Sequence, residues 1–278
     1  MPNAQCIMPN SQGLKAKGPS LKTGAIVLLV LSAISLLRAD GLAPTGTLRS
    51  SFIASNPVQG RVDPKTGAVT GPVADLTREL ARRLGVPFVI TPLPDAGSVL
   101  ESVKAGRVDI GFLAYEAARA TQVDFSQPYS LAASAYAVRA DSPIHTTADV
   151  DRAGVTIAAV KGVSQQIFVS ATVKNARVQV LDDTPSNEEM AKMFAAKQID
   201  AFAANRTRME ELARVSPQVR VLPDNFQTIG QAIVVQKGNS SGLRELGRFL
   251  DDVLASGFVK SSIERAGVAG VEPAAAKR

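Results

Sequence analysis

The sequence has few of the residues on which enzyme chemistry most often depends. Its 278 residues include one cysteine, one histidine and no tryptophan. A zinc site or a Cys–His pair is therefore excluded, and a Ser-His-Asp triad would have to be built on His145, which lies in the linker-like stretch DSPIHTTADV. The motifs GxSxG and GxxxxGKS/T are absent as well. We therefore expect a protein that is not an enzyme and that holds neither a metal ion nor another cofactor.

The N-terminus differs in character from the rest of the chain. Three lysines precede the apolar run AIVLLVLSAISLL at 25–37. This order predicts a secretory signal peptide over 1–39 and a mature protein located in the periplasm. The run is short for a membrane span, which needs roughly 20 residues, and an uncleaved signal anchor is the alternative. Cys6 lies before the run, so the mature chain would contain no disulfide.

The charge of the mature chain is close to balanced. The full sequence has 31 basic and 25 acidic residues, a net charge of +6. Removing 1–39 takes away four basic residues and no acid, which leaves 27 against 25, a net charge of +2. No basic block with interleaved aromatic residues is present. We therefore expect no binding of nucleic acid.

Strand-like and helix-like segments alternate from Leu48 onward, which predicts an α/β fold with a largely parallel sheet. A hairpin is expected around the turn DPKTG at 63–67. A capping box of Ser186 and Glu189 predicts a helix that begins at 187. The other predicted helices lie at 73–84, 98–104, 164–174 and after Asn205. The predicted strands lie at 48–54, 88–91, 108–114, 155–160, 177–181, 199–203 and 219–222.

Two extended stretches, 135–139 and 229–235, bracket the second run of alternating segments. If both are crossovers, the chain forms two lobes with a hinge of two strands between them. The first lobe would comprise 44–138 plus 230–278, and the second 140–228. A ligand cleft would then lie between the lobes.

One charged pair stands at the end of a predicted buried strand, in the stretch DIGFLAYEAARATQVDFSQPYS at 109–130. In open α/β sheets, ligands bind beyond the carboxyl ends of the strands, which is where Glu116 and Arg119 fall. A guanidinium presents a rigid fork that matches a carboxylate, so Arg119 is a candidate anchor for an acid. The alternative is a solvated helix arginine. Glu116 is the one acid that could act as a proton-transfer group.

A second candidate anion site lies in VKGVSQQIF at 160–168. There Gly162 ends a strand, and Ser164 could cap the following helix. The free amide groups of a helix N-terminus bind anions. An ordinary turn between a strand and a helix is the alternative.

Six segments in order carry a family resemblance: GPVADLTRELARRLGV, LESVKAGRVDIGF, AARATQVDFSQPYS, ADVDRAGVTIAAVKGVS, MAKMFAAKQIDAF and IGQAIVVQKGN. From about 46 to 267 the chain resembles the solute-binding proteins of ABC transporters, namely bacterial extracellular solute-binding protein family 3. The resemblance implies a two-lobed periplasmic-binding-protein fold of type II that closes on its ligand. It also implies a monomer that hands the ligand to an ABC permease in the inner membrane.

The resemblance also assigns candidate ligand-binding residues. Arg119 matches the arginine that holds the α-carboxylate of the ligand, and Asn205 stands where the family usually has an aspartate that receives the α-ammonium. The turn that adds bonds to the same carboxylate corresponds to Gly162, Val163 and Ser164. Further residues expected at the cleft wall, each of which could equally serve in packing or a turn, are Phe52, Asn56, Ala114 and Tyr115.

Three departures from the family pattern leave the ligand open. Glu116 and Val163 stand where the family usually has threonine, and a neutral Asn205 cannot neutralise an ammonium. Either Glu116 receives the ammonium, or the ligand is a carboxylate without one. We expect capture of a small carboxylate-bearing solute, an amino acid or a derivative. The alternatives are an enzyme similar to cyclohexadienyl dehydratase, with Glu116 in proton transfer, and a sensor module.

Overall fold

The computed structural model describes residues 41–276 of the chain. The predicted signal peptide, 1–39, lies outside the described residues. Leu42 and Ala43 are fully buried in the first apolar core. The described core of the first lobe therefore includes two residues that precede 44, its predicted start. None of the described helices is long and apolar enough to cross a membrane.

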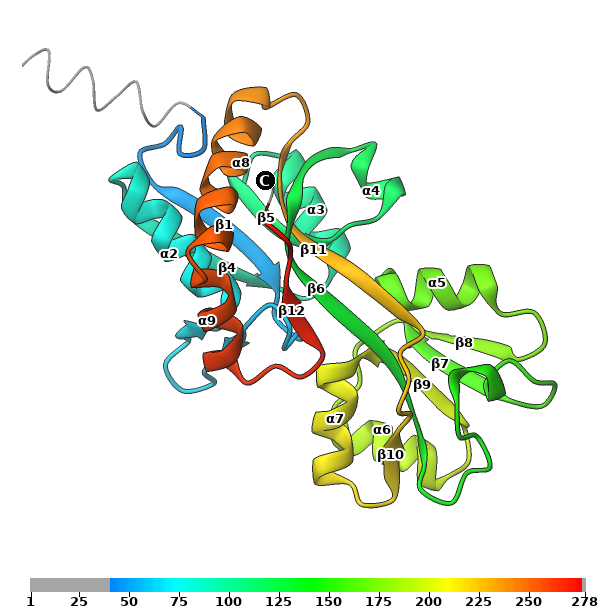
Figure 1. The fold of residues 1–278 in the computed structure, drawn as a ribbon. Coiled ribbons are helices and arrows are strands. Elements are labelled where there is room, and N and C mark those ends of the chain that lie inside the picture. The colour runs from blue at the N-terminus through cyan, green and yellow to red at the C-terminus, as the bar shows by residue number, and fades with distance from the viewer. Residues whose placement is uncertain (1–40, 277–278) are drawn as a thin grey trace, which may run out of the picture. The chain divides into compact units, whose positions relative to one another are not determined.

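The first part of the chain forms parallel strands with helices between them (Figure 1). β1 lies between β4 and β5 and pairs in parallel with both. The expected hairpin is present, with the turn at 63–67 joining β2 and β3. The bounds of these elements are β1 (Leu48–Ile53), β2 (Arg61–Val62), β3 (Val69–Thr70), α2 (Pro72–Leu84), β4 (Phe88–Leu93), α3 (Ala96–Lys104), β5 (Ile110–Ala114) and α4 (Ala117–Ala120).

Gly111 lets α3 lie close against β5. A Cβ at this glycine would stand 2.8 Å from Val103 Cγ2 and 3.0 Å from Val99 Cγ1, both on α3. The first distance is shorter than real Cβ contacts and the second is tighter than most of them, so a side chain at this position would force the two valines to move. The helix thereby stays in contact with the strand that leads directly to Arg119.

Two long strands run side by side through the middle of the sheet, β6 (Val123–Arg139) and β11 (Gln227–Gln236) (Figure 1). They pair antiparallel from Gln227 opposite Ser134 to Gln236 opposite Val123. The predicted crossover 135–139 is only the last part of β6. The DFSQPY segment forms the earlier part of the same strand.

The second part of the chain repeats the alternation of strands and helices. Its strand order continues from β6 through β9 and β7 to β8, and β10 pairs with the end of β6. Ser186 caps α6: its Oγ accepts from Glu189 N at 3.2 Å, and the Glu189 carboxylate accepts from Ser186 N at 2.7 Å, so the predicted capping box is confirmed. The bounds are η1 (Thr147–Asp149), β7 (Thr156–Val160), α5 (Ser164–Thr172), β8 (Arg177–Leu181), α6 (Asn187–Ala195), β9 (Ala201–Asn205), α7 (Arg206–Val215) and β10 (Val219–Val221).

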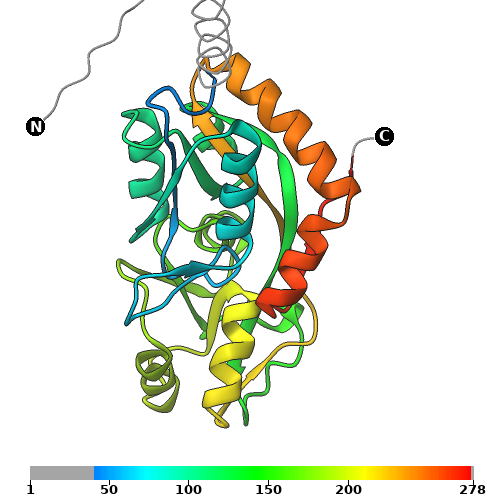
Figure 2. The ribbon, with the colours of Figure 1, turned by 90° about the vertical axis from the view of Figure 1, so that its left-hand side faces the viewer.

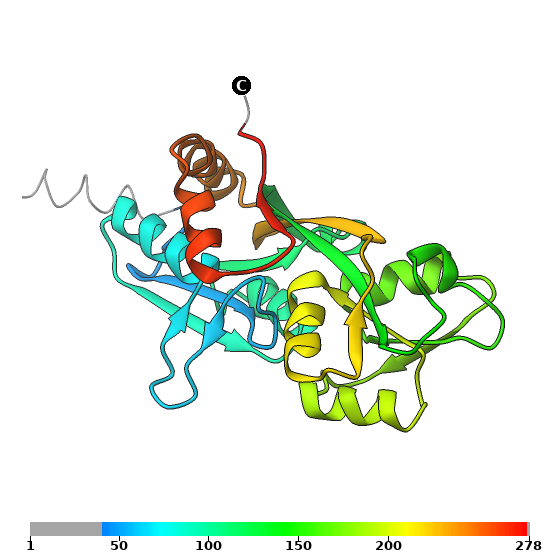
Figure 3. The ribbon, with the colours of Figure 1, turned by 60° about the horizontal axis from the view of Figure 1, so that its bottom comes forward.

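The chain ends with α8 (Ser240–Ala255), α9 (Phe258–Ala266) and β12 (Val271–Pro273). Figure 2 shows α8 and α9 lying in succession beside β6, and β12 pairs with β6. The loop that leads into β12 passes next to α7 (Figure 3), where Thr207 Oγ1 donates to Ala269 O at 2.7 Å. The C-terminal segment therefore contacts β6 in the middle of the sheet and α7 in the second part of the chain.

The apolar side chains gather in four clusters that divide into two pairs. Two clusters draw their buried residues only from 42–132 and 233–271, and the other two only from 136–222. Within β5, Phe112 and Leu113 belong to different clusters, so the two faces of the sheet are covered separately. The chain thus has the two-lobed α/β architecture. The lobe limits of 44–138 plus 230–278 and 140–228 stay a prediction.

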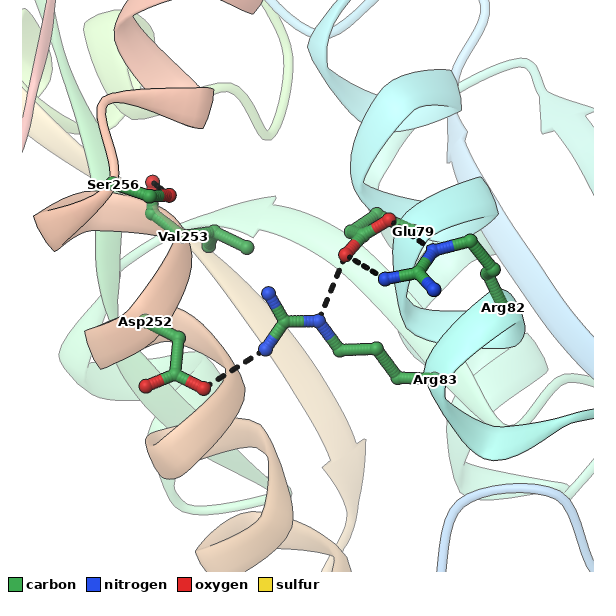
Figure 4. Close-up of polar contacts among 6 residues, drawn as sticks. All are labelled: Glu79, Arg82, Arg83, Asp252, Val253 and Ser256. Carbon is green, nitrogen blue, oxygen red and sulfur yellow. Dashed lines mark hydrogen bonds and ion pairs between the residues drawn. The ribbon is translucent and has the colours of Figure 1, made fainter.

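Helices α2 and α8 are joined by an arginine at the surface of the first lobe. The Arg83 guanidinium contacts the Glu79 carboxylate at 2.9 Å and the Asp252 carboxylate at 2.9 Å (Figure 4). It also lies 5.2 Å from the centre of the Phe249 ring. These contacts keep the two helices together on one face of the sheet.

Candidate functional site

A cavity of about 140 Å³ lies where strands from both lobes end. Its lining comes from the loops and helices that follow the carboxyl ends of β1, β4, β5, β7, β8 and β9, together with β6 and β11. This is the position at which open α/β sheets bind ligands. An engineered apolar cavity of about 150 Å³ admits a benzene ring, so the space suits a small solute.

Arg119 is the buried cation of the first lobe. It is only 8% exposed, because α4 follows β5 after two residues and turns the side chain inward. Its Nη1 donates to Ala114 O at 2.9 Å, and its Nη2 donates to Gly162 O, on the other lobe, at 2.6 Å. The described residues offer it no carboxylate within ion-pair distance. Burial lowers the pKa of the guanidinium, and the nearby charge of Glu116 partly opposes that shift.

The hydrogen bonds of Arg119 leave part of its fork free. A guanidinium has five N–H donors, and the two bonds to backbone carbonyls use two of them. A buried cation without a counter-charge is costly, and an anion in the cavity would relieve that cost. The geometry therefore offers a carboxylate a charged partner at the end of β5.

The turn after β7 supplies the facing wall. Gly162 has a φ of 73°, in the left-handed region that favours glycine, and its amide donates to Gln166 Oε1 at 3.0 Å. The expected cap by Ser164 is wrong, because the N-cap of α5 is Val163 and no side chain caps the helix. Ser164 is the first helical residue instead. It is 3% exposed and its Oγ has no hydrogen-bond partner.

Asn205 and Asn56 meet across the cavity from the two lobes. Asn205 caps α7, since its side-chain oxygen accepts from Arg208 N at 2.9 Å. Its Nδ2 donates to Asn56 Oδ1 at 3.3 Å, and that oxygen also accepts from Val58 N at 3.2 Å. The carboxamide oxygens of this pair are thus already engaged, and neither residue supplies a negative charge.

The structure brings together six of the ten predicted site residues as cavity lining. These are Asn56, Ala114, Arg119, Val163, Ser164 and Asn205. Gly162 contributes its carbonyl to Arg119 without lining the cavity. Further lining residues that the sequence did not single out include Ser55, Gln165, Arg208 and Gln231.

Phe52, Tyr115 and Glu116 do not line the cavity. Phe52 is fully buried in the apolar core of the first lobe. Tyr115 is 53% exposed and packs edge-to-face on Phe125, with 5.2 Å between ring centres. Glu116 occupies the N-cap position of α4 and makes no cap hydrogen bond.

The sequence and the fold both resemble known binding proteins. The model of a family described as bacterial extracellular solute-binding proteins, family 3, matches residues 53–266. A glutamine-binding protein of Geobacillus stearothermophilus is 27% identical over 176 residues. That match covers 60% of this chain and 64% of the relative, slightly less than two thirds of its length.

Three solved structures show the extent of the likeness in fold. A mutant of ArgBP from T. maritima has a TM-score of 0.69 at 24% identity, covering 83% of this chain and 99% of that one. An amino acid ABC transporter substrate-binding protein from Streptococcus pneumoniae bound to L-arginine has a TM-score of 0.69 at 20% identity, covering 82% and 97%. The ancestral amino acid-binding protein AncCDT-1, a precursor of cyclohexadienyl dehydratase, has a TM-score of 0.67 at 23% identity, covering 79% and 95%.

Proposed function

Because the chain belongs to the bacterial extracellular solute-binding proteins of family 3, we propose that it captures a small carboxylate-bearing solute, an amino acid or a derivative, in the cavity beside Arg119. The observation that carries this proposal is the burial of Arg119 at that cavity without a carboxylate partner in the described part of the chain. A carboxylate would accept charge-assisted hydrogen bonds from the N–H groups of the Arg119 guanidinium that remain free.

The second lobe would complete the carboxylate site. The Ser164 hydroxyl is buried at the cavity without a partner, and α5 begins at this residue. The first amides of a helix have no partner within the helix and favour negative charge. Closure of the lobes would then remove the carboxylate from water while each of its oxygens gains a donor.

The site favours an acid without an α-ammonium group. The side-chain oxygen of Asn205 already accepts a hydrogen bond from the Arg208 amide of α7, and Glu116 does not line the cavity. The two residues that the sequence offered as partners of an ammonium therefore do not present a charge to it, and the carboxylates that do line the cavity, those of Asp95, Asp182 and Asp183, are exposed to water. Of the two alternatives that the sequence left open, the geometry therefore supports the second, a carboxylate solute without an α-ammonium group.

Transport is the biological role that fits such a site. We infer that the mature protein is a monomer in the periplasm, reached through the N-terminal signal peptide, and that it delivers the solute to an ABC permease. The rival dehydratase activity would need a proton-transfer group at the solute. The acid that the sequence suggested for this step, Glu116, does not line the cavity.

A thermal-shift screen tests the proposal. The chain from residue 40 onward, which keeps the buried Leu42 and Ala43, is heated with amino acids, their derivatives and simple organic acids. A ligand at a hundredfold its dissociation constant contributes about 2.7 kcal/mol of stability. At least one carboxylate should raise the melting temperature of the wild type. No shift with any of the carboxylates would refute the proposal.

A further inference from the structure

A second guanidinium faces the same cavity from the other lobe. Arg208 lies in the first turn of α7 and lines the cavity together with Arg119. Its Nη1 donates to Ser55 O at 3.2 Å, and its Nη2 donates to Pro185 O. Its Nε is buried and has no hydrogen-bond partner. The side chain is thus held by backbone carbonyls with one buried donor left open.

Arg208 has no carboxylate within ion-pair distance among residues 41–276. Glu211, one turn further along α7, is the acid that acts on it electrostatically, but its carboxylate is engaged with Arg61. Burial lowers the pKa of the Arg208 guanidinium, and Glu211 only partly opposes that shift. Arg208 is half-buried, with its Nε enclosed, and like Arg119 it has no ion-pair partner among the described residues.

The acids around the cavity do not balance these two cations. Asp95, Asp182 and Asp183 line the cavity, yet all three are exposed. Asp182 contacts the Lys161 ammonium at 2.9 Å, and Asp95 caps α3 by accepting from Ser98 N at 2.7 Å. Water screens exposed charges, whereas buried ones act on a ligand at nearly full strength. Among the ionic groups of the lining, Arg119 is buried, Arg208 is half-buried with an enclosed Nε, and every acid is exposed.

We propose that the solute is a compact dicarboxylate, with one carboxylate bound by Arg119 and the other by Arg208. This inference rests on the proposed function and adds the class of solute. Two guanidiniums that line one cavity from opposite lobes, neither with an ion-pair partner in the described residues, are best satisfied by a ligand with an anionic group at each end. The cavity volume of about 140 Å³ favours a short carbon chain between them.

Arg208 has one rival role, that of a bond between the lobes. Its hydrogen bond to Ser55 O joins the second lobe to the first, as the bond from Arg119 to Gly162 O does. If joining the lobes were the whole role of Arg208, loss of its side chain would lower the affinity for every ligand by the same factor. A residue that binds the second carboxylate instead discriminates between ligands by their charge.

The test compares acids that differ by one charge and hardly in size. Succinate and glutarate are titrated calorimetrically against their monoamides, succinamate and glutaramate, with the wild type and the Arg208→Gln variant. For the wild type, the better diacid should bind about 30-fold or more tightly than its monoamide. In Arg208→Gln this preference should fall to within about threefold, while the affinity for the monoamide stays within about threefold of the wild type.

Three further variants make the result decisive. Arg214→Gln, an exposed change on the same helix, should leave every affinity unchanged. Arg119→Gln should lower the affinity for the diacid and the affinity for the monoamide together. If Arg208→Gln does not fold, as its melting curve would show, Arg208→Lys replaces it and should lose part of the preference, because a lysine lacks the planar fork.

The outcomes separate the two proposals. Equal binding of diacid and monoamide by the wild type, or an equal loss of both in the Arg208 variant, would overturn the dicarboxylate inference. The proposed function would survive those results as long as binding still depends on Arg119. If the wild type binds no carboxylate at all, both proposals fail.

Discussion

Replacement of Arg119 by alanine should weaken solute binding while leaving the fold in place. The side chain makes two hydrogen bonds, to the carbonyls of Ala114 and Gly162, and no ion pair among the residues described. Removing one partner of a buried charge pair at an interface costs about 2 to 5 kcal/mol. We expect the same range for the carboxylate, which corresponds to a loss in affinity of about 30-fold to several thousand-fold.

The stability of the free protein should change much less. The variant loses two hydrogen bonds of a charged donor, worth about 1.5 to 3 kcal/mol each, but it also removes an unneutralised buried cation, whose desolvation cost is of the same order. The two effects oppose each other. Calorimetric titration with a carboxylate found in the screen measures the binding, and urea denaturation measures the stability. Affinity within about threefold of the wild type would refute the assignment of Arg119.

Three further predictions concern the fold, and urea denaturation measures each of them. Gly111→Ala should cost about 1 to 3 kcal/mol, because the new methyl group would stand 2.8 Å from Val103 Cγ2; an unchanged midpoint would contradict the close packing of α3 on β5. Ser186→Ala should cost about 0.5 to 2 kcal/mol through loss of the cap on α6, and Ser186→Thr should restore most of it. Hydrogen bonds from Arg82 and Arg83 lower the pKa of Glu79 from 4.5 to about 2, so Glu79 stabilises the fold above pH 4.5 and loses this effect as the pH falls toward 2. Glu79→Gln should therefore cost about 1 kcal/mol at pH 7 and less at pH 3, and a cost that does not shrink in acid would speak against the ion pair.

The alternation of segments predicted an α/β fold, and the family resemblance implied its two lobes, but neither gave the extent of the central strand β6. The DFSQPY segment contains Pro128, which cannot donate to a neighbouring strand and therefore reads as an interruption. In the structure Pro128 lies opposite Ala232 between two register shifts in the pairing of β6 with β11. Such irregularities accommodate a proline within a sheet. Since they depend on the partner strand, about a hundred residues away in sequence, the local pattern could not reveal them.

Arg119 could be predicted because its position depends on neighbouring residues. It follows a buried strand directly, and the end of such a strand faces the ligand side of the sheet. Arg208 could not be predicted in this way. Its helix, RTRMEELARV, is rich in charge and reads as a solvated surface helix, and the guanidinium contacts Ser55 O, 153 residues away in sequence.

Phe52 and Tyr115 show the limit of assigning cavity walls from sequence. Both stand at or near the end of a strand beside the cavity, which made them candidates. β1 is buried on both faces except at Arg49, so alternation along the strand does not tell which side Phe52 takes. Tyr115 packs on Phe125 of β6 and does not line the cavity, and this contact between two strands is not visible in the local sequence.

The most direct test of the central claim is a crystal structure of the mature chain with a carboxylate found in the screen. We predict that a carboxylate of the solute accepts hydrogen bonds from the Arg119 guanidinium at about 2.7 to 2.9 Å, in the cavity between the two lobes. A solute that binds elsewhere, or that lies in this cavity with its carboxylate away from Arg119, would contradict the claim.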